Sequence, residues 1–231
     1  DEALKLVMPG KIFKLTRPVG FKTLVRTLKG YKMTERFSIE DKEFELVTEI
    51  TDLEEGERSV SGIYAKDSVV FIYYHGKYIP TPKTTETYFN FTARKNDVLL
   101  VILQEKWTAK RIANELSRII FGAKGYVAET EIAPEDLKAF HDQNPRGTKV
   151  SFFERVAQNI DKLSLYGPDL IEASLFEDYS SKANLWYIVA TSRRYGHVVG
   201  ITRNGIVVIF NKVTPKEYIE FVVNEVFPII T

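Results

Sequence analysis

The sequence predicts an α+β protein with two antiparallel-rich β-sheet units, each covered by an amphipathic helix. Three observations predict this class. Apolar residues recur at helical spacing in a few segments, β-branched and aromatic runs fill most of the remainder, and short polar turns at 93–97 and 203–205 join neighbouring runs as hairpins. Hairpin-connected strands lie antiparallel. We therefore expect antiparallel sheets and not a single doubly wound parallel sheet.

The first expected helix covers 21–29. Its apolar residues begin at Phe21 and continue at i+3, i+4 and i+7, and Gly30 follows where a helix C-terminal cap is favoured. The opposite face carries three cationic side chains, Lys22, Arg26 and Lys29.

Strands are expected next along the chain. The segment 44–50 alternates apolar and charged residues, and 68–74 is a dense β-branched and aromatic run. The segments 88–92 and 98–103 flank a polar turn and predict a hairpin.

A second helix is expected over 108–121, ended by Gly122. Its expected buried face includes Ile112, Leu116 and Ile120. A weaker strand follows at 126–132, and then a short helix over 135–141 after Pro134, a residue favoured in the first helical turn.

The loop 143–149, with its Asn-Pro-Arg-Gly run, predicts an exposed connection and a domain boundary. The expected domains are 1–142, a sheet–helix unit with a basic N-terminal segment, and 143–231, a helix–sheet–helix unit. A third helix is expected from Ser151, because Ser151 and Glu154 have capping-box spacing. A weaker strand is expected at 170–176.

The C-terminal part predicts a strand at 185–190, a hairpin of 197–202 and 206–210, and a fourth helix. Asn204-Gly205 is a strong hairpin-turn signal. The helix is expected from Thr214 to about residue 227, because Thr214 and Glu217 form a capping-box pattern around a proline at the first helical position. Its expected inward residues are Ile219, Val222 and Val226.

The segments 98–121 and 204–227 share one order of elements. Each has an apolar strand, a Lys-x-Thr-x-Lys turn and an amphipathic helix. The shared order raises the hypothesis of an internal duplication. The alternative is that strand-to-helix junctions commonly use Thr and Lys in this way.

The near-neutral total charge conceals separate charged blocks. Residues 1–36 carry nine basic and three acidic residues, a net charge of +6. Residues 37–57 carry nine acidic residues and one basic residue, net −8, and residues 58–124 return to +6 with eleven bases and five acids. Such blocks create local fields that the total of +1 does not describe. Interleaving of the blocks in the folded chain is the alternative.

No catalytic constellation is visible in the sequence. The chain has no cysteine, so thiol nucleophiles and thiolate metal sites are excluded, and its three histidines lack helical zinc-pair spacing. Phosphate-binding loops and a nucleophile-elbow motif are also missing. The acidic segment 52–57 lacks the ligand spacing of a calcium loop. We therefore expect neither an enzyme nor a metal or other cofactor.

The remaining signal is basic and aromatic. Lysine and arginine interleave with aromatic residues over 11–36, around the 108–121 helix and near the C-terminal hairpin. Cations bind phosphates, and exposed aromatic rings stack on unpaired bases. The candidate nucleic-acid-binding residues are Lys22, Arg26, Lys29, Arg94, Lys95, Lys110, Arg111, Arg118, Arg193 and Arg194. Ordinary solvated charge is the alternative.

The sequence thus favours a non-enzymatic nucleic-acid-associated module, DNA or RNA, that serves as an accessory subunit of a larger complex. A concrete version, by architecture alone, is a stand-alone counterpart of the N-terminal and linker regions that flank an Argonaute core. Two alternatives stay open. One is a protein–protein scaffold without nucleic acid, indicated by 15 Phe, 12 Tyr and 2 Trp. The other is an enzyme with a dispersed site.

Composition adds expectations about location and source. No apolar run reaches the length of a membrane-spanning helix, and no signal peptide is visible, so a cytoplasmic protein without membrane contact is expected. Few methionines, no cysteine and many Lys, Glu, Ile and Val residues are typical of a thermophile. A protein partner or self-association is expected as well.

Overall fold

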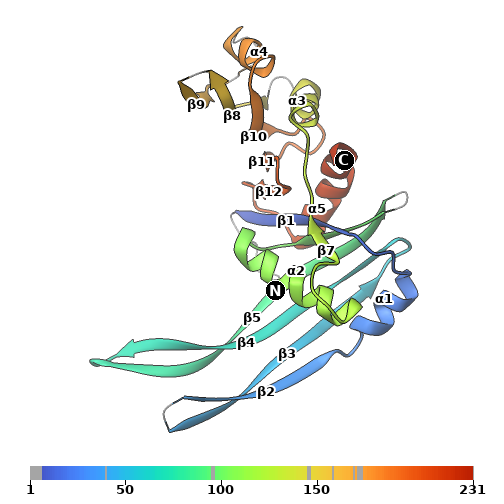
Figure 1. The fold of residues 1–231 in the computed structure, drawn as a ribbon, viewed down its shortest axis with the longest axis vertical. Helices are drawn as coiled ribbons and strands as arrows, with labels where there is room; N and C mark the ends of the chain where they lie inside the picture. The colour runs from blue at the N-terminus through green and yellow to red at the C-terminus, as the bar shows by residue number, and fades with distance from the viewer. Residues whose placement is uncertain are drawn as a thin grey trace. The chain divides into compact units, whose positions relative to one another are not determined.

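The computed structural model describes residues 7–39, 41–94, 97–144, 147–157, 159–168, 170 and 174–230. These residues form a mixed α+β protein whose strands pair antiparallel (Figure 1). The chain forms two compact units. Unit 1 comprises Asp1–Lys14, Leu103–Lys110 and Ala128–Thr231, and unit 2 comprises Leu15–Ile102 and Arg111–Val127. The expected division at 142/143 stays a prediction.

Unit 2 contains a sheet of long strands in the order β2-β3-β4-β5-β6. The strands are β2 (Lys32–Ile39), β3 (Lys42–Glu55), β4 (Ser59–Tyr74), β5 (Lys77–Arg94) and β6 (Asp97–Ile102). Helix α1 (Phe21–Leu28) packs against β3 and β4. Helix α2 (Lys106–Phe121) contributes its C-terminal part, from Arg111 onward, to this unit. In this part, Leu116 is completely buried.

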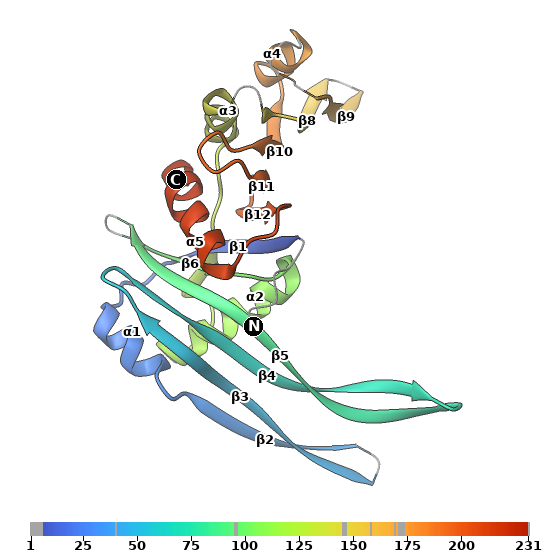
Figure 2. The same cartoon turned by 180° about the vertical axis from the view of Figure 1, so that it is seen from behind.

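Unit 1 contains strands in the order β1-β12-β11-β10-β8-β9, and β7 pairs with β1. The strands are β1 (Met8–Leu15), β7 (Val127–Glu129), β8 (Val150–Ala157), β9 (Ile160–Tyr166), β10 (Asn184–Thr191), β11 (Val198–Thr202) and β12 (Ile206–Ile209). Helix α3 (Pro134–Gln143) packs against β10, and α4 (Ser174–Ser180) packs against β8 (Figure 2).

Helix α5 (Pro215–Phe221) confirms the capping box: the Glu217 amide donates to Thr214, and Glu217 accepts from the Thr214 amide. The chain then continues as a π-helical turn (Val222–Val226) and a 3₁₀ turn (Phe227–Ile229). The buried hydroxyl of Tyr218 donates to the Val207 carbonyl oxygen at 2.8 Å. Ile219, Val222 and Val226 are buried, as expected.

Several other expectations are confirmed. The helices over 21–29, 108–121 and 135–141 are present, and the hairpins around 93–97 and 203–205 are present as β5–β6 and β11–β12. Of the expected α2 core residues, Ile112 and Leu116 are buried, but Ile120 is only half-buried. The expected strand at 126–132 is limited to β7. The internal duplication stays a prediction.

The helix expected from Ser151 is wrong: this segment is strand β8. Ser151 and Phe153 are buried and alternate with half-buried Phe152 and Glu154, which is the period of a strand. The segment is rich in Val and Phe, which favour strands, and its Ser-x-x-Glu spacing caps nothing.

Two weaker expectations also need correction. Within the expected strand at 170–176, residues 171–173 lie outside the described residues, and Ser174–Ser180 is helical. The loop expected to be exposed at 143–149 contains buried Asn144 and Thr148. Polar residues are tolerated there because each finds a partner: Asn144 donates to the Phe140 carbonyl, and Thr148 contacts His141 at 2.6 Å.

Candidate nucleic-acid interface

Helix α1 presents a basic face to solvent in unit 2. Leu24 and Leu28 are completely buried against the sheet, whereas Lys22, Arg26 and Lys29 are exposed. These three cations recur at i, i+4 and i+7, so they lie along one side of the helix. None of them forms an ion pair with another residue in the described part of the chain. The helix therefore carries three cationic groups that are open to an anionic ligand.

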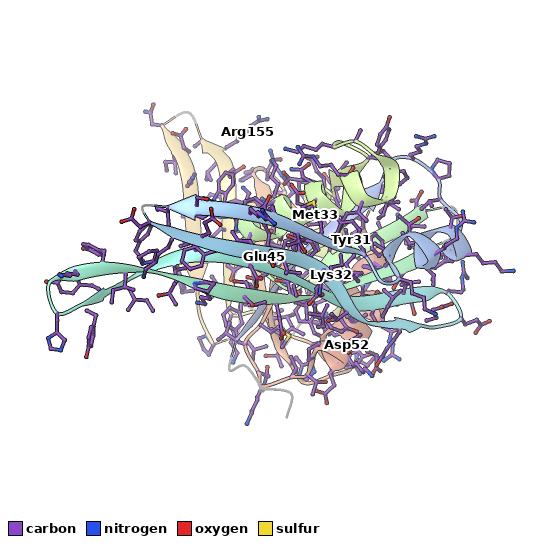
Figure 3. The ribbon with its side chains drawn as sticks, turned by 90° about the horizontal axis from the view of Figure 1, so that it is seen from below. Tyr31, Lys32, Met33, Glu45, Asp52 and Arg155 are labelled. Atoms are coloured by element: carbon purple, nitrogen blue, oxygen red, sulfur yellow. The ribbon has the colours of Figure 1, made fainter. Side chains whose placement is uncertain are left out.

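Two acidic residues of β3, Glu45 and Glu49, project from the other face of the unit 2 sheet. Leu46 and Ile50 are buried on the side where α1 packs, and strand alternation places Glu45 and Glu49 opposite. Glu45 faces Arg36 across the β2–β3 pair, and the ammonium of Lys32 lies 3.1 Å from a carboxylate oxygen of Glu49. Glu45 and Lys32 are labelled in Figure 3. The sheet thus separates these carboxylates from the basic face of α1.

The other expected cations of unit 2 differ in whether they form ion pairs with carboxylates. Arg94 contacts Asp97 at 3.1 Å, and Arg118 contacts Glu115 at 3.3 Å, so both have carboxylate partners. Arg111 is exposed and has no ion pair with another described residue. Lys95 lies outside the described residues. Of these residues, Arg111 most resembles the α1 cations.

Lys110 belongs to unit 1, where it forms part of an ion triad. Its ammonium lies 2.6 Å from one oxygen of Glu129, and the ammonium of Lys11 lies 2.9 Å from the other. The two lysines, Lys110 first, lower the pKa of Glu129 to about 2. Lys11 is completely buried and also donates to the Asn204 carbonyl at 2.7 Å. Lys110 is therefore engaged within its own unit.

Arg193 and Arg194 lie on the tight turn between β10 and β11 in unit 1. Both are exposed, and the Arg194 guanidinium lies over the Tyr195 ring at 5.3 Å and 3.8 Å from Glu225. Glu225 lies on the π-helical turn, an irregularity that is frequent at functional sites. A shallow hollow beside the turn is lined by Gln143, Asn144, Arg193, Arg194 and Glu225.

An aromatic cluster on β8, β9 and β10 was not predicted from the sequence. Phe152 has its ring centre 5.9 Å from Tyr166, 5.5 Å from Trp186 and 5.2 Å from Tyr187. Phe153 faces α4 and is completely buried, so Phe152 projects from the opposite face, where Tyr166 is 68% exposed. Recognising β8 as a strand from its alternating residues would have revealed this face.

The described residues contain no group of three or more acidic or histidine side chains that could hold a metal ion. No helix in the described part of the chain is long and apolar enough to cross a membrane. A scan against models of known protein families finds no match, and no curated protein is significantly similar to this chain.

Proposed function

We propose that this protein is a non-enzymatic nucleic-acid-associated module that acts as an accessory subunit of a larger complex. The observation that carries the proposal is the basic face of α1, with Lys22, Arg26 and Lys29 exposed and free of ion pairs among the described residues. Cations in such a row neutralise successive phosphates and release counterions, which supplies most non-specific affinity for nucleic acids. Their separation from the β3 carboxylates leaves a local positive field.

The turn of Arg193 and Arg194 supports the same proposal from unit 1. Arg193 is exposed and can contact a phosphate, and Arg194 lies over the Tyr195 ring, where its planar guanidinium can stack on a base. DNA or RNA, a cytoplasmic location, a protein partner and a thermophilic source stay predictions, as does the likeness to the regions that flank an Argonaute core.

Binding is expected to depend steeply on salt. Each neutralised phosphate contributes about −0.7 to the slope of log K against log salt for a single strand. Replacing Arg26 and Arg111 together with glutamine is expected to flatten this slope by roughly one to two units. It should weaken all sequences alike, because phosphate contacts carry no base information. Fluorescence anisotropy with labelled single-stranded and duplex DNA and RNA over a salt series measures the effect.

A matched control removes the same charge elsewhere in unit 2. Arg36 and Lys42 lie on the β2–β3 strand pair among the acidic residues, and their joint replacement with glutamine should leave the slope unchanged. An equal effect of the two double variants would indicate a dependence on net charge alone. No binding by the folded protein at low salt, to any of the four nucleic acids, would contradict the proposal.

The aromatic face of unit 1 favours the second candidate function, a protein–protein scaffold. Exposed aromatic groups are enriched at interfaces, and apolar docking is insensitive to salt. Tyr166→Asp is expected to release a partner that otherwise co-purifies at high salt after nuclease treatment. Leu175→Asp, at an exposed position of α4, is the control and should retain it. Release by nuclease or salt alone would favour the nucleic-acid function instead.

A further inference from the structure

The outer ends of β4 and β5 form a two-stranded ribbon, here named the β4–β5 arm (Asp67–Thr84). The β3–β4 pairing ends at Lys66, and the β5–β6 pairing begins at Phe89, so in the described residues the arm strands pair only with each other. Figures 1 and 2 show this ribbon diverging from the β2–β3 ribbon within unit 2. A free two-stranded ribbon is at best marginally stable in water.

Specific contacts fix both ends of the arm. At its base, Asp67 accepts from the Thr84 hydroxyl at 2.6 Å and from the Val47 amide at 2.9 Å. These bonds, with that from Thr84 the larger cause, lower the pKa of Asp67. At its tip, His75 and Gly76 have φ angles of 46° and 79°, as in a type I′ turn. A turn of this kind sets the strand register, so the arm has a defined geometry.

The arm exposes an unusual amount of apolar surface. Phe71, Ile72, Tyr73, Tyr74 and Tyr78 are 50–69% exposed, and side chains project from both faces of the ribbon (Figure 3). Side chains of this size carry about 150–250 Å² each, so these five expose on the order of 600 Å². This area is divided between the two faces of the ribbon, so each face exposes on the order of 300 Å², within the range of the largest patch on a typical monomer.

The two edges of the arm differ in their capacity to add a strand. Tyr74 and Lys77 flank the two-residue turn and form a hydrogen-bonded pair. Along an antiparallel ribbon, hydrogen-bonded pairs alternate with non-hydrogen-bonded pairs. The pairs Phe71↔Pro80 and Val69↔Pro82 are therefore non-hydrogen-bonded. The backbone groups of these residues therefore point outward. On β5 the two central outward positions, 80 and 82, are prolines, which have no N–H and disfavour strand addition; Tyr78 and Thr84 are the outward residues on either side of them. On β4 the outward N–H and C=O groups belong to Val69, Phe71 and Tyr73.

We propose that the β4 edges of two copies of this chain pair antiparallel about a twofold axis at Phe71, forming a dimer. Phe71 then faces its symmetry mate, and Val69 faces Tyr73 of the second copy, which gives six reciprocal backbone hydrogen bonds. The segment 68–74 has no charged residue or proline, and Lys77 and Lys83 lie on β5, away from the shared edge. This assembly goes beyond nucleic-acid association and does not depend on it.

The prolines also determine the size of the assembly. Each arm has one open edge, so pairing of the two open edges leaves Pro80 and Pro82 at the outer edges of a four-stranded sheet. Addition of a further copy there is disfavoured, because Pro80 and Pro82 provide no outward N–H donors in the middle of the edge. In this arrangement the open β4 edge is covered, and growth into a fibre is disfavoured.

Sedimentation velocity of the full chain tests the proposal, with a dimer expected for the native sequence. Val69→Pro removes one outward N–H and no bond within the arm, and Phe71→Lys places two cations at the axis. Each is expected to raise the dimer dissociation constant by about tenfold or more. Thr81→Lys adds the same charge on β5 and should leave the dimer unchanged.

Two outcomes would overturn the proposal. One is a native chain that stays monomeric up to about 100 μM. The other is a dimer that Val69→Pro and Phe71→Lys leave intact. Replacing Pro80 and Pro82 together with valine is expected to produce assemblies larger than a dimer. Thermal melting of each variant verifies that the body of the protein remains folded.

Discussion

Leu116→Ala is expected to lower the free energy of unfolding by about 2–5 kcal/mol, the range for a large-to-small substitution in a well-packed core. Leu116 is completely buried and lies in the part of α2 that belongs to unit 2. The substitution removes three carbon atoms and leaves a cavity between the helix and the sheet. The cavity can be filled only if the helix backbone moves. Urea denaturation monitored by circular dichroism measures the loss.

Leu175→Ala supplies the control for this change. It deletes the same atoms from a helical leucine that is 52% exposed, so its effect should stay within about 0.5 kcal/mol. A loss below about 0.5 kcal/mol for Leu116→Ala would mean that this face of α2 is not packed in solution.

Local patterns predicted the elements that local chemistry determines. The Asn204-Gly205 turn and the Thr214 capping box each depend on residues only a few positions apart, so both could be predicted from the sequence. Ser151 shows the limit of this reasoning. Its capping-box spacing is local, but the segment is a strand because β9 and β10 pair with it on both sides. Tertiary pairing thus overrode the local signal.

Only one strand of the β4–β5 arm was predicted from the sequence. The run 68–74 has a clear strand composition, whereas Pro80 and Pro82 in the partner segment normally count against a strand. They are compatible with β5 because the arm strand has a free edge, and only the pairing of the whole hairpin reveals which edge that is.

In the candidate site too, features set by local sequence were predicted and features set by tertiary folding were not. The α1 cations follow from helical periodicity, so Lys22, Arg26 and Lys29 could be predicted. The engagement of Lys110 by Glu129 could not be predicted, because those residues are brought together by tertiary folding and not by sequence spacing. The aromatic face around Phe152 depended on the β8 assignment and was lost with it.

Glu129→Gln is expected to cost on the order of 2–3 kcal/mol of stability at pH 7. Its partner Lys11 is completely buried, and removing one member of a buried pair leaves an uncompensated charge that costs about 3–5 kcal/mol. Glu129 itself is 32% exposed, so solvent screening reduces the figure. Glu105→Gln is the control: this carboxylate is exposed, forms no ion pair among the described residues, and should change stability by less than about 0.5 kcal/mol.

The pH dependence separates this charge effect from a loss of packing. Ion pairing with Lys110 and Lys11 lowers the pKa of Glu129 to about 2, from an ordinary value of 4.5. The stability that it contributes is therefore present above pH 4.5 and is lost as the pH falls toward 2. The difference between the native chain and Glu129→Gln should shrink across that window, as measured by urea denaturation at successive pH values. A difference that stays constant down to pH 2 would assign the loss to packing instead.

The alkaline side gives an independent check on the same triad. Burial is the largest cause that lowers the pKa of Lys11, and Glu129 opposes it by favouring the charged ammonium. Without the carboxylate, Lys11 should release its proton at a lower pH, and its neutral amine needs no counter-ion. The unfolded chain then holds this proton more tightly than the folded variant, so the variant gains stability as the pH rises. The loss caused by Glu129→Gln is thus expected to be largest near neutral pH and smaller on both sides.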